Sequence, residues 1–166
     1  MSGRILRLLL LAVVAGLGVW GWRLLHPSPE HVIRKELAEL ARTACVPANE
    51  GNLAKLANAQ KLAGFFTPDV EITFDLPGRF SQSISGRAEL QEKALGARGM
   101  LSGLTVEFLD VNVTVAPDGQ SATVDLTAKA NLPGDSVPQV EEVKVGLKKI
   151  EGDWLIQHAE NVKTLR

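Results

Sequence analysis

The chain has 166 residues, which is the size of one ordinary domain. Its 18 Lys and Arg residues nearly balance 19 Asp and Glu residues, and the formal net charge of −1 excludes a strongly basic nucleic-acid-binding protein. A hydrophobic content of 45% with 22% charged residues excludes wholesale disorder and indicates a folded chain.

The N-terminal segment is the clearest signal in the sequence. Residues 8–22 contain no charged side chain and are flanked by Arg7 and Arg23. About 20 helical residues are needed to cross the hydrocarbon core of a bilayer. We therefore expect the membrane span to include the neighbouring apolar residues and to cover 5–25, with both arginines reaching towards the lipid headgroups.

Three interpretations of this segment compete: a cleaved signal peptide, a retained signal anchor and a buried soluble helix. A cleaved signal needs an Ala-x-Ala-like site of small residues after its apolar region, and residues 19–25 provide no such site. A soluble helix needs a polar face, which this segment lacks. Trp20 and Trp22, next to Arg23, resemble the aromatic belt of a membrane interface. The sequence favours a retained anchor in contact with the lipid bilayer.

The orientation of the anchor follows from the basic residues near its ends. Arg4, Arg7 and the terminal amine lie on the N-terminal side, whereas the basic residues beyond Arg23 are interleaved with acidic ones. This balance predicts a single-pass protein of the inner (cytoplasmic) membrane with its N-terminus inside. The C-terminal domain is then extracytoplasmic, and periplasmic in a bacterium. The predicted division is an anchor at 1–25, a linker at 26–29 and a domain at 30–166.

Apolar residues at helical spacing predict three amphipathic helices after the linker. A Ser–Pro pair at 28–29 is a favourable start for the first helix, which Pro47 ends. The second helix begins near Asn52 and stops at residues 67–68. The third opens at residues 85–86.

Alternating apolar and polar residues predict the strands. Within residues 104–115, the apolar positions before Leu109 have the opposite parity to those after it. Because an extra residue is needed to bury both sets on one face, we expect a bulge or bend within about two residues of Leu109. The other predicted strands are 70–74, a short edge strand at 80–84, 122–132, 143–150 and 154–162.

Three local motifs carry a resemblance to a known superfamily. They are Phe-Phe-Thr-Pro-Asp-Val-Glu-Ile at 65–72, Ile-x-Gly-Arg-x-x-Leu at 84–90 and Gly-x-Trp-x-Ile at 152–156. In this order, and with a kinked long strand, the chain resembles the SnoaL-like branch of the nuclear transport factor 2-like superfamily over residues 30–163. The resemblance implies an α+β, cone-shaped fold of three helices packed on a strongly curved antiparallel sheet.

The resemblance also implies an apolar pocket on the concave face of that sheet. Its expected lining consists of apolar residues from a helix and several strands: Phe66, Phe74, Leu90, Val106, Val124, Val145, Trp154 and Ile156.

Asp75 and His158 are the candidate catalytic residues. Asp75 resembles the general-base aspartate of the superfamily's ketosteroid isomerases, but its place between a strand and a turn favours a side chain that accepts backbone hydrogen bonds. His158 shares strand parity with Trp154 and Ile156, so we expect it to face the interior, as an acid–base group or as a core residue. Those isomerases also use a tyrosine, and this chain has none.

Other chemistry has little support in the sequence. No histidines or cysteines stand at metal-ligand spacing, so we expect neither a metal nor a cofactor. Cys45 is the only cysteine, which excludes an intramolecular disulfide. The basic residues Lys144, Lys148 and Lys149, together with Arg87 and Arg98, are interpreted as a solvated face.

Three functions remain open at this point. The first is a non-catalytic module that binds a small apolar ligand or a protein partner. The second is a small isomerase or dehydratase that uses Asp75 and His158. The third is a structural subunit of an envelope assembly, resembling the periplasmic domain of this fold in type IV secretion systems. The superfamily also makes a homodimer a reasonable expectation.

The anchor prediction can be tested by protease access. With the N-terminus inside, a tag after Arg166 is expected to be cleaved when protease is added to spheroplasts, because the domain lies outside the membrane. Protection of that tag, or recovery of a soluble protein that lacks residues 1–25, would contradict the prediction.

Overall fold

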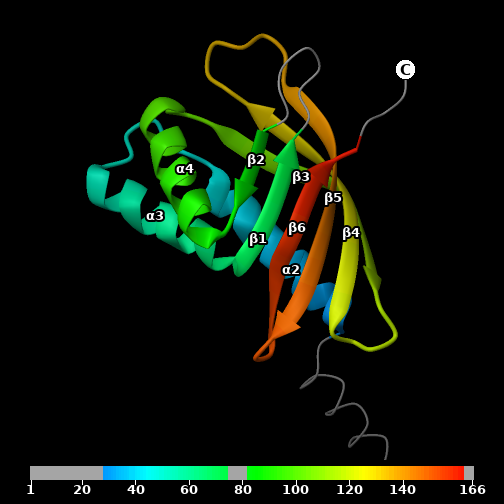
Figure 1. Cartoon of the computed structure of the whole chain (residues 1–166). Coiled ribbons are helices and arrows are strands. Elements are labelled where there is room, and N and C mark those ends of the chain that lie inside the picture. The colour runs from blue at the N-terminus through cyan, green and yellow to red at the C-terminus, as the bar shows by residue number, and fades with distance from the viewer. Residues whose placement is uncertain (1–27, 75–81, 163–166) are drawn as a thin grey trace, which may run out of the picture.

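The computed structural model of the protein describes residues 28–74 and 82–162. These residues form three helices and a six-stranded sheet (Figure 1), which confirms the predicted α+β architecture. In chain order the elements are α2 (Pro29–Ala44), α3 (Asn52–Gly64), β1 (Phe66–Phe74), β2 (Gln82–Ser85), α4 (Arg87–Met100), β3 (Thr105–Val115), β4 (Ser121–Asn131), β5 (Gln139–Ile150) and β6 (Asp153–Asn161).

No helix within the described ranges is long and apolar enough to cross a membrane. The predicted anchor, with Arg7, Trp20, Trp22 and Arg23, lies outside the described residues, as does Asp75.

The order of strands across the sheet is β2-β1-β6-β5-β4-β3. Four of the five pairings are antiparallel, but β1 and β6 run parallel to each other. The expectation of a wholly antiparallel sheet is therefore wrong at this pair. Both strands begin at the same end of the sheet, where Phe66 lies opposite Ile156. Alternation within a strand does not reveal the direction of a partner that is distant in the chain.

The helices divide into two groups (Figure 1). Helix α2 passes behind the sheet in this view and packs along β3, whereas α3 and α4 pack against each other, with α4 against β1 and β2. The Ser28 side chain caps α2 by accepting a hydrogen bond from the backbone N–H of His31 at 3.4 Å. Helix α3 ends at Gly64, before the predicted stop at residues 67–68, because Phe66 already pairs with β6.

The motif at residues 84–90 ties α4 to the sheet. Gly86 has a φ of +86°, a conformation that favours glycine, and its N–H donates to the carbonyl of Val70 at 2.7 Å. Arg87 then donates from Nε to the carbonyl of Phe66 at 2.9 Å. These two bonds orient the first turn of α4, whose Leu90 is buried. Arg87 is therefore a structural residue rather than part of a solvated basic face.

The predicted irregularity in β3 is confirmed. Leu109 lies opposite Thr127 and Asn112 lies opposite Asp125, so β3 has one residue more than β4 in this interval. Asp110 has a φ of +51°, which marks the site of the bulge. Because of the extra residue, Phe108 before the bulge and Val113 after it both pack against the hydrophobic core.

A second bulge, which the sequence analysis did not predict, lies in β6. Leu147 of β5 pairs with Ile156, and the preceding residue Gly146 pairs with His158. Gln157 is therefore an additional residue in β6. As a consequence, Ile156 and Ala159, three positions apart, are both buried on the same side of the sheet.

A buried ion pair joins the helices to one another. The side chains of Arg98 and Glu50 are 3% and 2% exposed, and Nη2 of Arg98 lies 2.6 Å from Oε1 of Glu50. Arg98 also donates to the backbone carbonyls of Thr43 at 2.7 Å and Cys45 at 2.9 Å. Asn58 of α3 donates to the same Glu50 oxygen at 2.6 Å. The expectation that Arg98 belongs to a solvated face is wrong.

The charge of this pair is maintained by its own hydrogen bonds. Those from Arg98 to the Glu50 carboxylate outweigh the opposing effect of burial and lower the pKa of Glu50 below its ordinary value of 4.5. Glu50 is therefore ionised at neutral pH, as its partner requires.

Removal of Arg98 is expected to destabilise the protein severely. Arg98→Ala leaves the Glu50 carboxylate buried without its cation, and loss of one partner of a buried pair costs about 3–5 kcal/mol. Urea unfolding of the full-length chain, followed by circular dichroism, measures the change in the free energy of unfolding.

The matched control is Arg42→Ala. Arg42 is 77% exposed and pairs with Glu39 on the surface of α2, so its loss is expected to cost less than about 1 kcal/mol. Equal losses of stability in the two variants would show that the Arg98–Glu50 pair has no special role.

Candidate functional site

The two faces of the sheet differ sharply in chemistry. One cross-strand row consists of Ile72, Ala159, Val145, Val124 and Val113, all of which are buried. The adjacent row consists of Glu71, His158, Gly146, Thr123 and Thr114. We call the first side the inner face and the second side the outer face. The inner face packs against α2, and the outer face is polar.

A cavity of about 280 Å³, which we call the inner cavity, lies on the inner face. Helix α2 contributes Leu37 and Leu40 to its wall, and the remaining lining residues come from five strands. Thirteen of the fifteen described lining residues are apolar, and the two polar ones are Gln139 and Glu141. The strand residues are Phe66, Ile72, Phe74, Phe108, Leu126, Ala128, Ala130, Gln139, Glu141, Val143, Val145, Ile156 and Ala159.

Small side chains leave the space for this cavity. Along the inner face of β4 the residues change from Leu126 to Ala128 and Ala130, and the opposing residues of β5 are Val143, Glu141 and Gln139. An alanine fills much less volume than the leucine in the preceding position. The inner face is therefore densely packed at one end of β4 and open at the other.

The eight residues expected to line the ligand pocket occupy three different environments. Phe66, Phe74, Val145 and Ile156 line the inner cavity. Val106 instead lines a groove of about 540 Å³ between α2 and β3, where its N–H lies 3.2 Å from Sγ of the half-buried Cys45. Leu90, Val124 and Trp154 are buried in the core and line neither space.

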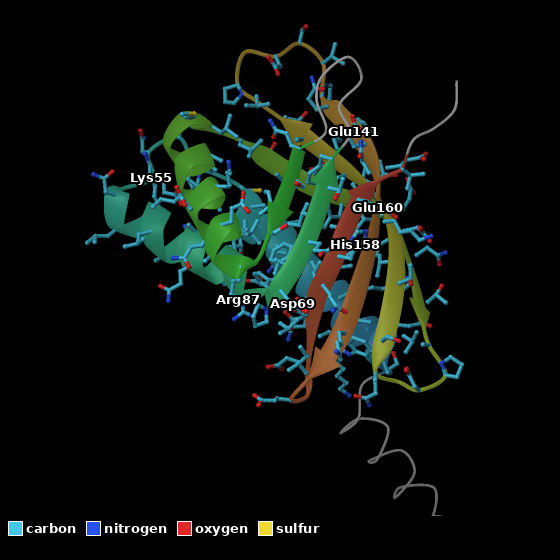
Figure 2. The ribbon with its side chains drawn as sticks, in the orientation of Figure 1. Lys55, Asp69, Arg87, Glu141, His158 and Glu160 are labelled. Carbon is cyan, nitrogen blue, oxygen red and sulfur yellow. The ribbon has the colours of Figure 1, made fainter. Side chains whose placement is uncertain are left out.

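His158 does not face the apolar interior, and that expectation is wrong. The bulge at Gln157 reverses the parity of β6, so Ile156 faces inward while His158 faces outward. The side chain of His158 is 43% exposed, and its Nε2 lies 3.5 Å from Oε2 of Glu160. Figure 2 shows both residues on β6.

A second, polar depression surrounds His158 on the outer face; we call it the outer hollow. Its volume is about 460 Å³, and its lining includes Asp69, Glu71 and Thr123. Gly146, opposite His158, provides no side chain, which leaves the middle of the hollow empty. A layer of sheet separates this hollow from the inner cavity, so His158 cannot act on a molecule held among the inner apolar residues.

Two lining residues of the inner cavity carry polar groups that the sequence analysis did not single out as site residues. Glu141 and Gln139 share the parity of Val143 on β5, and the register places them opposite Ala128 and Ala130. The available signal was the sequence of β4 itself, in which two alanines follow Leu126 on the apolar face. Small residues at one end of an otherwise bulky face indicate unfilled space there.

Comparison with solved structures shows that this fold is shared by other proteins. A nuclear transport factor 2-like protein with a cystatin-like fold from Novosphingobium aromaticivorans is 17% identical with a TM-score of 0.61, covering 90% of this chain and 86% of that one. A nuclear transport factor 2-like protein of unknown function from Pseudomonas putida KT2440 is 12% identical with a TM-score of 0.61, covering 81% of this chain and 85% of that one.

A third similar structure is described as that of a proposed scytalone dehydratase. It comes from Novosphingobium aromaticivorans DSM 12444, is 14% identical with a TM-score of 0.58, and the match covers 82% of this chain and 84% of that one. No protein-family model and no curated protein matches the sequence. At these identities the structural similarity establishes the fold, and function has to be argued from the site.

Proposed function

We propose that this protein is a non-catalytic binding module that holds a small apolar molecule in the inner cavity. The observation that carries the proposal is the composition of the cavity wall, in which thirteen of fifteen described residues are apolar. Transfer of apolar surface from water into such a space is favourable at about 25 cal/mol for each Å² buried. Concave, mainly apolar spaces with a few polar groups are the usual form of small-molecule sites.

The size of the cavity limits the ligand. At about 280 Å³ it has about twice the volume of a cavity of about 150 Å³ that accepts benzene. A molecule of roughly ten to fifteen non-hydrogen atoms is the corresponding size. Phe66, Phe74 and Phe108 in the wall favour a ligand that contains an aromatic ring or an alkyl chain.

The position of His158 supports binding rather than the isomerase or dehydratase alternative. General acid–base catalysis needs titratable groups within hydrogen-bonding reach of one substrate. His158 lies on the outer face, so it is on the wrong side of the sheet to act on a ligand in the inner cavity. Among the described residues that line the cavity, Glu141 is the one with a titratable side chain.

The cellular setting of the proposal comes from the sequence. With residues 5–25 as a retained anchor in the inner membrane, the inner cavity would sample the periplasmic or extracytoplasmic space close to the bilayer. An apolar molecule that partitions into lipid would then be concentrated near the module. A homodimer or an envelope protein partner is compatible with this arrangement and forms part of the same proposal.

Filling the inner cavity is expected to abolish binding. The probe is 4-phenylbutanol, a neutral molecule with 11 non-hydrogen atoms. At about 0.5 kcal/mol per atom its Kd is on the order of 0.1 mM. Ala128→Phe places a large side chain in the cavity and is expected to weaken binding at least tenfold, on the order of 1.4 kcal/mol. The measurement is calorimetric titration of the full-length chain in phosphatidylcholine nanodiscs, with empty nanodiscs as the blank.

Thr127→Phe is the control variant. Thr127 is the adjacent residue of β4 and lies on the outer face, so the same side chain is added without entering the inner cavity. This variant is expected to bind 4-phenylbutanol like the wild type. Failure of the wild type to bind, or equal loss in both variants, would contradict the proposed site.

A further inference from the structure

The two polar residues at the inner cavity stand together at its rim. Glu141 and Gln139 are alternate residues of β5 and are exposed, whereas Val143 and Val145, which follow them on the same face, are buried. Figure 2 shows Glu141 towards the end of the sheet where the loop between β4 and β5 lies. The wall of the cavity therefore changes along β5 from apolar in its depth to polar at its mouth.

Within the part of the chain that the structure describes, no cationic side chain pairs with the carboxylate of Glu141. No Lys, Arg or His is among the described residues that line the cavity. The ion pairs found within residues 28–74 and 82–162 involve Glu39, Glu50, Glu107 and Glu160, and none involves Glu141. A negative charge beside an apolar space, without a cationic partner, favours a ligand that brings the positive charge itself.

We propose that the inner cavity is selective for an apolar molecule with an ammonium group at one end, and that Glu141 is the residue that determines this specificity. The inference rests on the proposed function, since it assigns the ligand class of the same cavity. The apolar part lies against Val143 and Val145, and the ammonium group stays at the mouth, where it keeps part of its hydration. There it donates hydrogen bonds to the Glu141 carboxylate and to the side-chain carbonyl of Gln139.

The selectivity is expected to be moderate, because Glu141 is exposed and water screens its charge. Ion pairs in such surroundings correspond to at most about a fivefold change in affinity. The Glu141 carboxylate repels an anionic end group, and it neither attracts nor repels a neutral hydroxyl group by its charge. The predicted order of affinity for ligands with the same apolar part is therefore amine, then alcohol, then carboxylate.

A matched series of three probes tests this order: 4-phenylbutylammonium, 4-phenylbutanol and 4-phenylbutanoate. Each is titrated into the full-length chain in phosphatidylcholine nanodiscs, with empty nanodiscs as the blank. The amine is expected to bind about three to five times more tightly than the alcohol, and the carboxylate more weakly than the alcohol. In Glu141→Gln the advantage of the amine is expected to disappear, while the Kd of the alcohol stays within about twofold of the wild type.

Glu142→Gln is the matched control, because it removes the same charge from the next residue of β5, which faces the opposite side of the sheet. This variant is expected to retain the higher affinity of the wild type for the amine.

The inference is overturned if the wild type binds the amine no better than the alcohol, or if Glu141→Gln keeps the full difference in affinity between the two. If the wild type binds the amine but does not bind the alcohol, the apolar cavity is not the site of binding. If it binds none of the three probes, the proposed function itself fails.

Discussion

The function proposed for this protein depends on a simple constraint: side chains alternate between the two faces of a strand, so one extra residue reverses every side chain that follows. Strands β3 and β6 each contain one such extra residue. The bulge at Asp110 brings Val111 and Val113 to the inner face, and the bulge at Gln157 does the same for Ala159. Without these residues the inner face would lose its apolar continuity halfway along both strands, and the inner cavity would lose Ala159 from its lining.

The same two bulges separate the chemistry of the sheet into an apolar side and a polar side. Because β6 changes phase after Ile156, His158 joins Glu71 on the outer face instead of entering the cavity. Among the described residues that line the inner cavity, Glu141 is the one that can transfer a proton. A protein with this arrangement can hold an apolar molecule by burial, with little capacity to stabilise charge that develops in a reaction.

The inner cavity also needs its helical wall, and the Arg98–Glu50 pair holds the helices in place. Arg98 of α4 bonds to the carbonyl of Thr43 at the end of α2, while Asn58 of α3 bonds to Glu50. All three helices therefore meet at the buried Arg98–Glu50 pair. Since α2 supplies Leu37 and Leu40 to the wall of the inner cavity, weakening the Arg98–Glu50 pair would also make that wall less rigid.

Much of the fold could be predicted because its signals are local. Helix starts, turns and alternation identified the elements, and the bulge in β3 was visible because bulky apolar residues stand on both sides of the phase change. The bulge in β6 left no such signal, since histidine is common in both buried and exposed positions. Arg98 was misassigned because charged residues are almost never fully buried unless they are paired. The partner, Glu50, lies in a loop 48 residues earlier.

The candidate site was only partly accessible to sequence reasoning. Phe66, Phe74, Val145 and Ile156 could be assigned to the inner face from their parity and the resemblance. Which apolar residues line a space, and which fill the core, depends on volumes across several strands. Val124 and Ala128 occupy equivalent positions on β4, yet only Ala128 borders the cavity. The specificity proposed for Glu141 required knowledge of the register that places it opposite this alanine.

The most direct test of the central claim is to locate the bound probe by NMR. With methyl-labelled full-length protein, the ring protons of 4-phenylbutanol are predicted to show intermolecular Overhauser effects to the methyl groups of Ile156 and Ala128, which line the inner cavity. The methyl group of Thr123, which lines the outer hollow, is predicted to show none. Contacts to Thr123 without contacts to Ile156 and Ala128 would contradict the assignment of the inner cavity as the binding site.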